Sequence, residues 1–184
     1  MCPRRLQTRQ LLFPTLRPAR NLRSMDHLWS PWRYRYVSET NQERECIFCA
    51  KSSAAEDSKN FIVYRGKYNF VLLNIFPYCS GHLMVAPYRH VATLQDVDPD
   101  TLTELAWITR MAEMKLRDTY NAPGYNIGMN IGASAGAGIA SHIHMHVLPR
   151  WPGDANFMTT IAETRVLPED LPTTYNKLLT AFGT

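Results

Sequence analysis

In the first half of the chain, short hydrophobic runs are separated by polar stretches and turns. Two runs, Phe61–Tyr64 and Tyr68–Leu73, flank a short turn that contains Gly66, and this pattern predicts a β-hairpin. A third run, His82–Ala86, follows a turn containing Pro, Ser and Gly and predicts another antiparallel strand. Residues 51–60 show neither a strand period nor a helical one, so we interpret them as a linker.

The pattern changes to a helical period in the second half. Asp98 and Pro99 are typical of a helix start, apolar residues then recur three or four positions apart, and the pattern ends at Asn121 before Pro123. Further elements are expected at 125–131 (strand), 142–148 (strand) and 175–182 (short helix). This order predicts an α+β fold, with an antiparallel sheet of about five strands, one long helix and a short C-terminal helix.

Composition and charge exclude several classes of protein. The chain has 184 residues, of which 45% are hydrophobic, and its apolar runs are too short for a membrane span, so we expect no membrane partner. The net charge of +4 arises in residues 1–24, which hold six Arg and no acid, whereas the remainder carries 14 basic against 16 acidic residues. We therefore expect no nucleic-acid partner, and we interpret residues 1–24 as a disordered or mis-called extension before Met25. A transit peptide is the alternative.

The cysteines indicate a reducing environment. Cys46 and Cys49 form a C-x-x-C pair, and the chain shows neither a secretory signal nor the cysteine spacing of a disulfide scaffold. We therefore expect a cytoplasmic protein with free thiols.

Three histidines provide the main candidate for chemistry. His142, His144 and His146 alternate along an expected strand, so their imidazoles share one face while the residues between them share the other. Three imidazoles on one face favour a functional site. A polar outer face and a metal-binding tract are the two alternatives.

The triad and its flanking motifs resemble the histidine triad (HIT) family of nucleotidyl hydrolases and transferases. The segment Gly81–His90 resembles the family's G-H-x-L-V-x-P-x-x-H strand, and Asn130–Gly132 resembles its N-x-G motif. The likeness runs from about Cys46 to Pro149 and implies a HIT fold, with residues 25–184 as a single HIT domain and a C-terminal extension after about residue 150. Segments 128–132, 136–138 and 149–158 resemble the bacterial diadenosine tetraphosphate phosphorylase branch, as does Leu28–Arg33.

The resemblance implies a role for each triad histidine. A neutral imidazole can attack phosphorus without prior deprotonation, and His144 is the implied nucleophile. His146 is expected to donate to the phosphate and the leaving oxygen, while the backbone near His142 fixes the tautomer of His144.

Nucleotide contacts are implied on either side of the triad. Asn74 matches the family's ribose contact, and the expected adenine pocket is apolar. Many family members place Gln where this chain has Gly138, so Ser134 or backbone amides are expected to replace that contact. The implied nucleotide-binding residues are Asn74, Asn130, Ser134, Gly136, Gly138, Phe48 and Ile75, with Phe70, Leu72 and Phe76 as further pocket candidates that could equally be core.

Two further sets of residues are candidates for binding. Cys46, Cys49, His90 and His142 together offer the donors of a structural zinc site, which some relatives carry, although the thiols could instead pack as small apolar groups. A second set could clamp a second nucleotide or form a dimer contact: Trp29, Trp32, Arg33, Arg150 and Trp151.

The resemblance implies an enzyme that cleaves diadenosine polyphosphates, as a diadenosine tetraphosphate phosphorylase would, through a covalent adenylyl-histidine. The alternatives are a hydrolase of adenosine phosphoramidates or nucleotide conjugates, and a zinc-stabilised nucleotide-binding regulator. Inorganic phosphate or water is the expected second substrate, no organic cofactor is expected, and the resemblance implies a homodimer.

Overall fold

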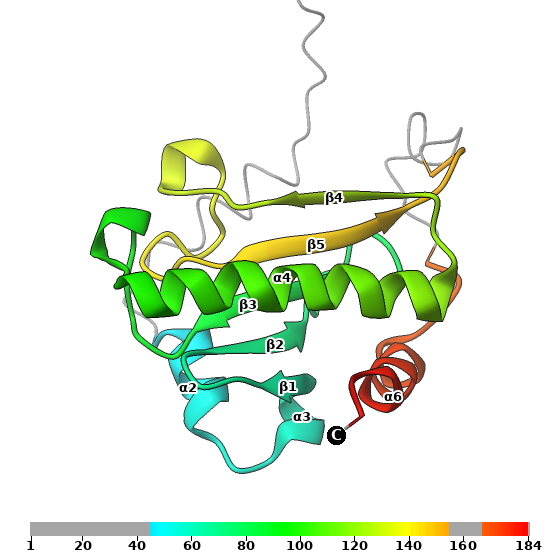
Figure 1. Cartoon of the computed structure of the whole chain (residues 1–184), viewed down its shortest axis with the longest axis horizontal. Coiled ribbons are helices and arrows are strands. Elements are labelled where there is room, and N and C mark those ends of the chain that lie inside the picture. The colour runs from blue at the N-terminus through cyan, green and yellow to red at the C-terminus, as the bar shows by residue number, and fades with distance from the viewer. Residues whose placement is uncertain (1–44, 155–166, 184) are drawn as a thin grey trace, which may run out of the picture. The chain divides into compact units, whose positions relative to one another are not determined.

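Five strands form one antiparallel sheet in the order β1-β2-β3-β5-β4 (Figure 1). The computed structural model describes residues 45–154 and 167–183. The strands are β1 (Ile62–Arg65), β2 (Asn69–Leu73), β3 (Leu83–Pro87), β4 (Gly124–Gly128) and β5 (Met145–Arg150); the helices are α2 (Ile47–Ser53), α3 (Asp57–Asn60), α4 (Pro99–Tyr120) and α6 (Leu171–Phe182), with short 3-10 turns η1 (Leu94–Asp96) and η2 (Ala133–Ala135). The predicted α+β arrangement is confirmed.

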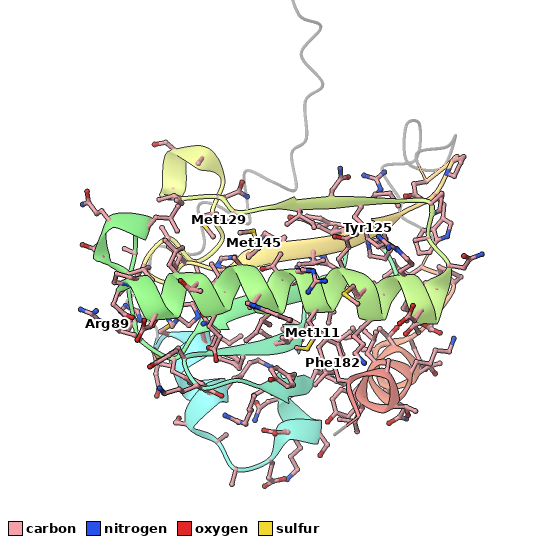
Figure 2. The ribbon with its side chains drawn as sticks, viewed as in Figure 1. Arg89, Met111, Tyr125, Met129, Met145 and Phe182 are labelled. Atoms are coloured by element: carbon pink, nitrogen blue, oxygen red, sulfur yellow. The ribbon has the colours of Figure 1, made fainter. Side chains whose placement is uncertain are left out.

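Strand alternation divides the core into two layers. Side chains such as Val71, Val85 and Val147 form one cluster with the apolar faces of α4 and α6. Met111 of α4, Met145 of β5 and Phe182 of α6 pack against this cluster and are labelled in Figure 2. The opposite face of the sheet carries a second cluster, made by Phe48 of α2 with Ile62, Phe70, Leu72, Met84 and Ala86.

The long helix is built as its sequence predicts. The Asp98 carboxylate accepts a hydrogen bond from Thr101 N, Pro99 occupies the first turn, and Asn121 ends the helix in the left-handed region. Glu104 then ties α4 to the β1–β2 turn, because its carboxylate accepts from the backbone N–H groups of Lys67, Tyr68 and Asn69. Burial opposes ionisation, but hydrogen bonds from Asn69 and this backbone lower the pKa of Glu104 below its ordinary value.

The interpretation of residues 51–60 as a linker is wrong. Most of this stretch belongs to the end of α2 and to α3, both of which are too short to show a helical period. Arg65 of β1 fixes them by tertiary contacts, because its guanidinium donates to Ser52 O, Ala54 O and the Asp57 carboxylate. Arg65 is thus the residue that holds this segment on the sheet.

Other boundaries shift by a few residues. Helix α6 begins at Leu171 behind an Asp170 cap, earlier than expected, and β5 begins at Met145, so His142 and His144 precede the strand. The expectations for residues 1–24 and for Trp29, Trp32 and Arg33 lie outside the described residues. Within the described ranges, no helix is both long enough and apolar enough to cross a membrane.

Candidate active site

The triad histidines lie together where the chain enters β5, on the sheet face that α2 covers. The ring centroid of Phe48 lies 4.8 Å from that of His144 and 5.1 Å from that of His142. The ring centroids of His144 and His146 are 4.9 Å apart. His142 is fully buried and His144 is only 5% exposed, so little water reaches either imidazole.

A backbone contact fixes the tautomer of His144. Its Nδ1 lies 3.0 Å from the carbonyl oxygen of His142. A carbonyl only accepts hydrogen bonds, so Nδ1 carries the proton and the lone pair is on Nε2. His144 therefore offers a neutral nitrogen nucleophile in a fixed orientation.

A chain of hydrogen bonds likewise fixes the tautomer of His146. The backbone N–H of Tyr78 donates to His82 Nδ1 at 3.1 Å, so the ring proton of neutral His82 is on Nε2. His82 Nε2 lies 2.9 Å from His146 Nδ1 and donates to it. Neutral His146 must then carry its own proton on Nε2, where it can donate to a bound oxygen.

His82 is the functional residue that the sequence did not reveal. It precedes β3, is fully buried, and reaches His146 because β3 and β5 are neighbours in the sheet. Its only signal in the sequence was its place beside Gly81 in the family-like motif. At Gly81 φ is +79°, and a side chain there would meet Tyr120 at 2.9 Å, so glycine brings this turn against α4.

Burial keeps the triad neutral. It lowers the pKa of His142 and of His144 below the ordinary value for histidine. For His146, burial and then the nearby charge of His144 lower the pKa to about 4. At neutral pH the three imidazoles are therefore uncharged, which suits a nucleophile and an N–H donor.

The low pKa of His146 predicts that the fold loses stability in mild acid. An unfolded histidine has a pKa of 6.5, whereas folded His146 titrates at about 4. Between these values the unfolded chain binds more protons, so the free energy of unfolding falls as the pH drops from 6.5 toward 4. Urea unfolding at pH 7 and pH 5 measures this. The His146→Asn variant should depend less on pH over this range, and identical profiles for the two proteins would contradict the assignment.

The candidate nucleotide contacts are placed unevenly around the triad. Asn74 follows β2, accepts from Phe76 N and lies 3.4 Å from His82 Nδ1, so it is close to the triad. Phe48 belongs to α2, and half-buried Ile75 lies in the β2–β3 turn. Ser134, Gly136 and Gly138 belong to the loop around η2. Phe70 and Leu72 are fully buried and belong to the core, and Phe76 is 67% exposed.

Four side chains form a candidate metal site beside the triad. The donor atoms of Cys46, Cys49, His90 and His142 all lie within 4.8 Å of one another. His142 Nδ1 is 3.3 Å from Cys46 Sγ, and His90 Nδ1 is 3.4 Å from Cys49 Sγ. Tetrahedral zinc with these ligands would separate the donors by about 3.3–3.8 Å.

The hydrogen bond on the far side of the His142 ring also suits a metal. His142 Nε2 lies 2.9 Å from Pro87 O and donates to it, which leaves Nδ1 unprotonated and directed at the thiols. The residues present therefore fit a structural zinc ion, and the sequence had identified all four of them.

His146 lines a cavity of about 1030 Å³. Leu148, Arg150, Tyr120 and Trp151 line the same cavity, and so does Asn130. Arg150 and Trp151, for which the sequence allows either a nucleotide clamp or a dimer contact, thus line the same cavity as the last triad histidine.

Known proteins are similar to this chain in sequence and in fold. A model of the HIT domain matches residues 55–153. An AP-4-A phosphorylase of Mycobacterium tuberculosis is 37% identical over 166 residues, which cover 86% of this chain and 85% of that protein. An adenosine 5'-monophosphoramidase of Saccharomyces cerevisiae is 31% identical over 106 residues, covering 57% of this chain and 62% of the relative.

A solved structure agrees. A zinc-bound histidine triad family protein from Mycobacterium smegmatis superimposes with a TM-score of 0.62 at 30% identity, covering 76% of this chain and 94% of the other. The domain match spans more than half of the chain and includes the whole triad. The chain therefore belongs to the histidine triad family.

Proposed function

We propose that this chain cleaves diadenosine tetraphosphate by adenylyl transfer through His144. As a HIT-family enzyme it is a nucleotide phosphorylase or hydrolase, and the proposal concerns its substrate and its intermediate. The observation that carries it is the pair of fixed tautomers, because they provide a lone pair on His144 and an N–H donor on His146, whose ring is adjacent.

The proposed first step forms a bond from His144 Nε2 to the α-phosphorus. The bond from phosphorus to the bridging oxygen breaks at the same time, and ATP leaves with that oxygen. His146 Nε2–H donates to the oxygen as charge develops on it. His144 Nδ1–H stays on the His142 carbonyl, which stabilises the positive charge of the substituted ring.

In the second step an oxygen nucleophile attacks the same phosphorus. The bond to His144 Nε2 breaks, and its electron pair returns to the imidazole. Inorganic phosphate as the nucleophile gives ADP, and water gives AMP. The sequence similarity to an AP-4-A phosphorylase favours phosphate.

We propose a structural role for zinc held by Cys46, Cys49, His90 and His142. When bound, the ion would tie α2 and the segment after β3 to the entrance of β5. His142 would then serve two groups, the metal through Nδ1 and His144 through its carbonyl oxygen. The reacting atoms belong to His144 and His146, which are not in the ligand set.

The products distinguish the candidate functions. Incubation with diadenosine tetraphosphate and phosphate should give ADP and ATP. Without phosphate, an enzyme that also accepts water should give AMP and ATP. AMP and ATP in both reactions would identify a hydrolase. Binding without any product would overturn the proposal and favour a nucleotide-binding regulator.

A second candidate is hydrolysis of adenosine phosphoramidates, which the similarity to the yeast monophosphoramidase favours. It uses the same two steps with an amine as the leaving group. A kcat/KM for adenosine 5'-phosphoramidate far above that for diadenosine tetraphosphate would favour this second function.

We also propose a homodimer formed through α4 and the edge strand β4. Trp107 is 61% exposed and Met114 is 44% exposed, and their spacing of seven residues puts them on one stripe of α4. Ile127 of β4 is 44% exposed, and the ring of Tyr125 lies 5.9 Å from the guanidinium of Arg117 in α4. A second copy would cover this apolar surface.

Trp107→Glu should therefore weaken the dimer. Burying an interfacial tryptophan is worth about 2 kcal/mol or more, so the dimer Kd should rise by at least an order of magnitude. Sedimentation measures it, and Leu94→Glu, which alters an exposed apolar side chain in η1, is the control. A wild-type chain that sediments as a monomer would exclude the proposed dimer.

A further inference from the structure

We propose that the cavity beyond His146 is the subsite for the leaving nucleotide and binds the polyphosphate and nucleoside of a departing nucleoside 5'-polyphosphate. The inference rests on the proposed function, because it assigns the half of the substrate that the adenylyl-transfer step expels. Three independent features of the cavity support it: its position, an unpartnered buried hydroxyl, and a cationic and aromatic far end.

Its position suits a leaving group. In a direct displacement, the leaving oxygen departs on the side of phosphorus opposite the attacking His144. The N–H donor for that oxygen is on His146, and His146 also lines the cavity. Leu148 and Arg150 follow His146 on the same strand face, so a polyphosphate leaving past His146 runs along this face of β5.

Ser80 provides an unpartnered donor in the wall. Its side chain is 8% exposed, and its Oγ has no hydrogen-bond partner among the described residues. A buried hydroxyl without a hydrogen-bond partner costs free energy, so such groups usually bind water or a ligand. Ser80 lies in the β2–β3 turn and lines the cavity, where its hydroxyl can donate to a phosphate oxygen.

Arg150 provides the charge for phosphates at the end of β5. Its Nε donates to Asp154 at 2.7 Å and its Nη1 to Asn126 at 2.7 Å. These two bonds hold the guanidinium in place, and its five N–H groups leave the Nη2 edge for an anion. Arg150 lies four residues beyond His146, about 13 Å along an extended strand, a span suited to a chain of several phosphates.

Aromatic side chains form the far end. Trp151 and Tyr120 pack edge to face with ring centroids 6.3 Å apart, and both line the cavity. Tyr120 is anchored because its hydroxyl donates to Glu169 at 2.7 Å. Bases stack on aromatic rings without strong dependence on sequence, so this end suits a nucleoside. The end of β5, the C-terminal end of α4 and α6 meet at this end of the sheet (Figure 1).

Two substrates that share the AMP half test the subsite. Diadenosine tetraphosphate fills the cavity on leaving, whereas adenosine 5'-phosphoramidate expels only ammonia. Ser80→Ala and Arg150→Gln should each lower kcat/KM for the tetraphosphate by about 10- to 100-fold, the range for losing a hydrogen bond to a charged group. Activity on the phosphoramidate should stay within about twofold.

Folding controls separate a binding role from a structural one. Ser80→Ala removes no hydrogen bond within the described protein, so its melting temperature should not fall. Lys59→Ala removes a positive charge from α3, which contacts β1 at the opposite edge of the sheet, and should affect neither substrate. Equal losses on both substrates, or no loss on the tetraphosphate, would overturn the subsite. A wild-type enzyme that cleaves only the phosphoramidate would instead overturn the proposed function.

Discussion

Replacing His144 with Asn should abolish turnover of diadenosine tetraphosphate, with a loss of several orders of magnitude in kcat. Asparagine removes the Nε2 lone pair that forms the proposed bond to phosphorus. AMP binding should persist, because the proposed ribose and phosphate contacts lie on other residues. Steady-state kinetics and calorimetric titration of AMP measure the two effects.

The matched control is His146→Asn. This change removes an N–H donor rather than the nucleophile, so the expected loss is smaller, about 10² to 10³-fold. Quenching the wild-type enzyme at alkaline pH with labelled substrate should trap the adenylyl group on His144, because phosphoramidates survive base better than acid. Substantial activity in His144→Asn, or a label on another residue, would overturn the covalent mechanism.

The parts of the fold that were predictable are those in which local pattern and tertiary packing agree. Helix α4 has a capping carboxylate, a proline in its first turn and an apolar face buried against β2, β3 and β5, so its sequence period is also its packing period. Helices α2 and α3 have no such agreement. Arg65, which follows them in the chain, fixes their position through contacts that no local pattern encodes.

The site shows the same division between local and long-range information. The triad and the C-x-x-C pair could be identified because each repeats a donor within a few residues. His82 could not, because a single histidine before an apolar strand is an ordinary residue until the sheet order is known. The register that pairs Met84 with His146 brings His82 within reach and sets the proton on His146. The cavity arises in the same way, from the meeting of a turn, a strand end and two helices.

Removing zinc should lower the melting temperature more than substituting His144 or His146 would. The ligands come from α2, from the segment after β3 and from the entrance to β5, so the ion would join three parts of the chain that are distant in sequence. At free zinc 1,000 times its Kd, binding stabilises the folded state by about 4 kcal/mol. In a chain of this length that corresponds to roughly 8–16 °C.

Metal analysis and thermal unfolding test this together. The purified wild-type protein should contain about one zinc per chain, and both a strong chelator and Cys46→Ser should lower the melting temperature by the amount above. Cys79→Ser is the matched control, because Cys79 is not in the ligand set and donates instead to Pro149 O, so that variant should keep its zinc. Well below the lowered melting temperature, folded Cys46→Ser should retain most of its kcat, because no reacting atom is a metal ligand. Metal-free wild-type protein of unchanged stability would show that the two thiols and two imidazoles pack without an ion.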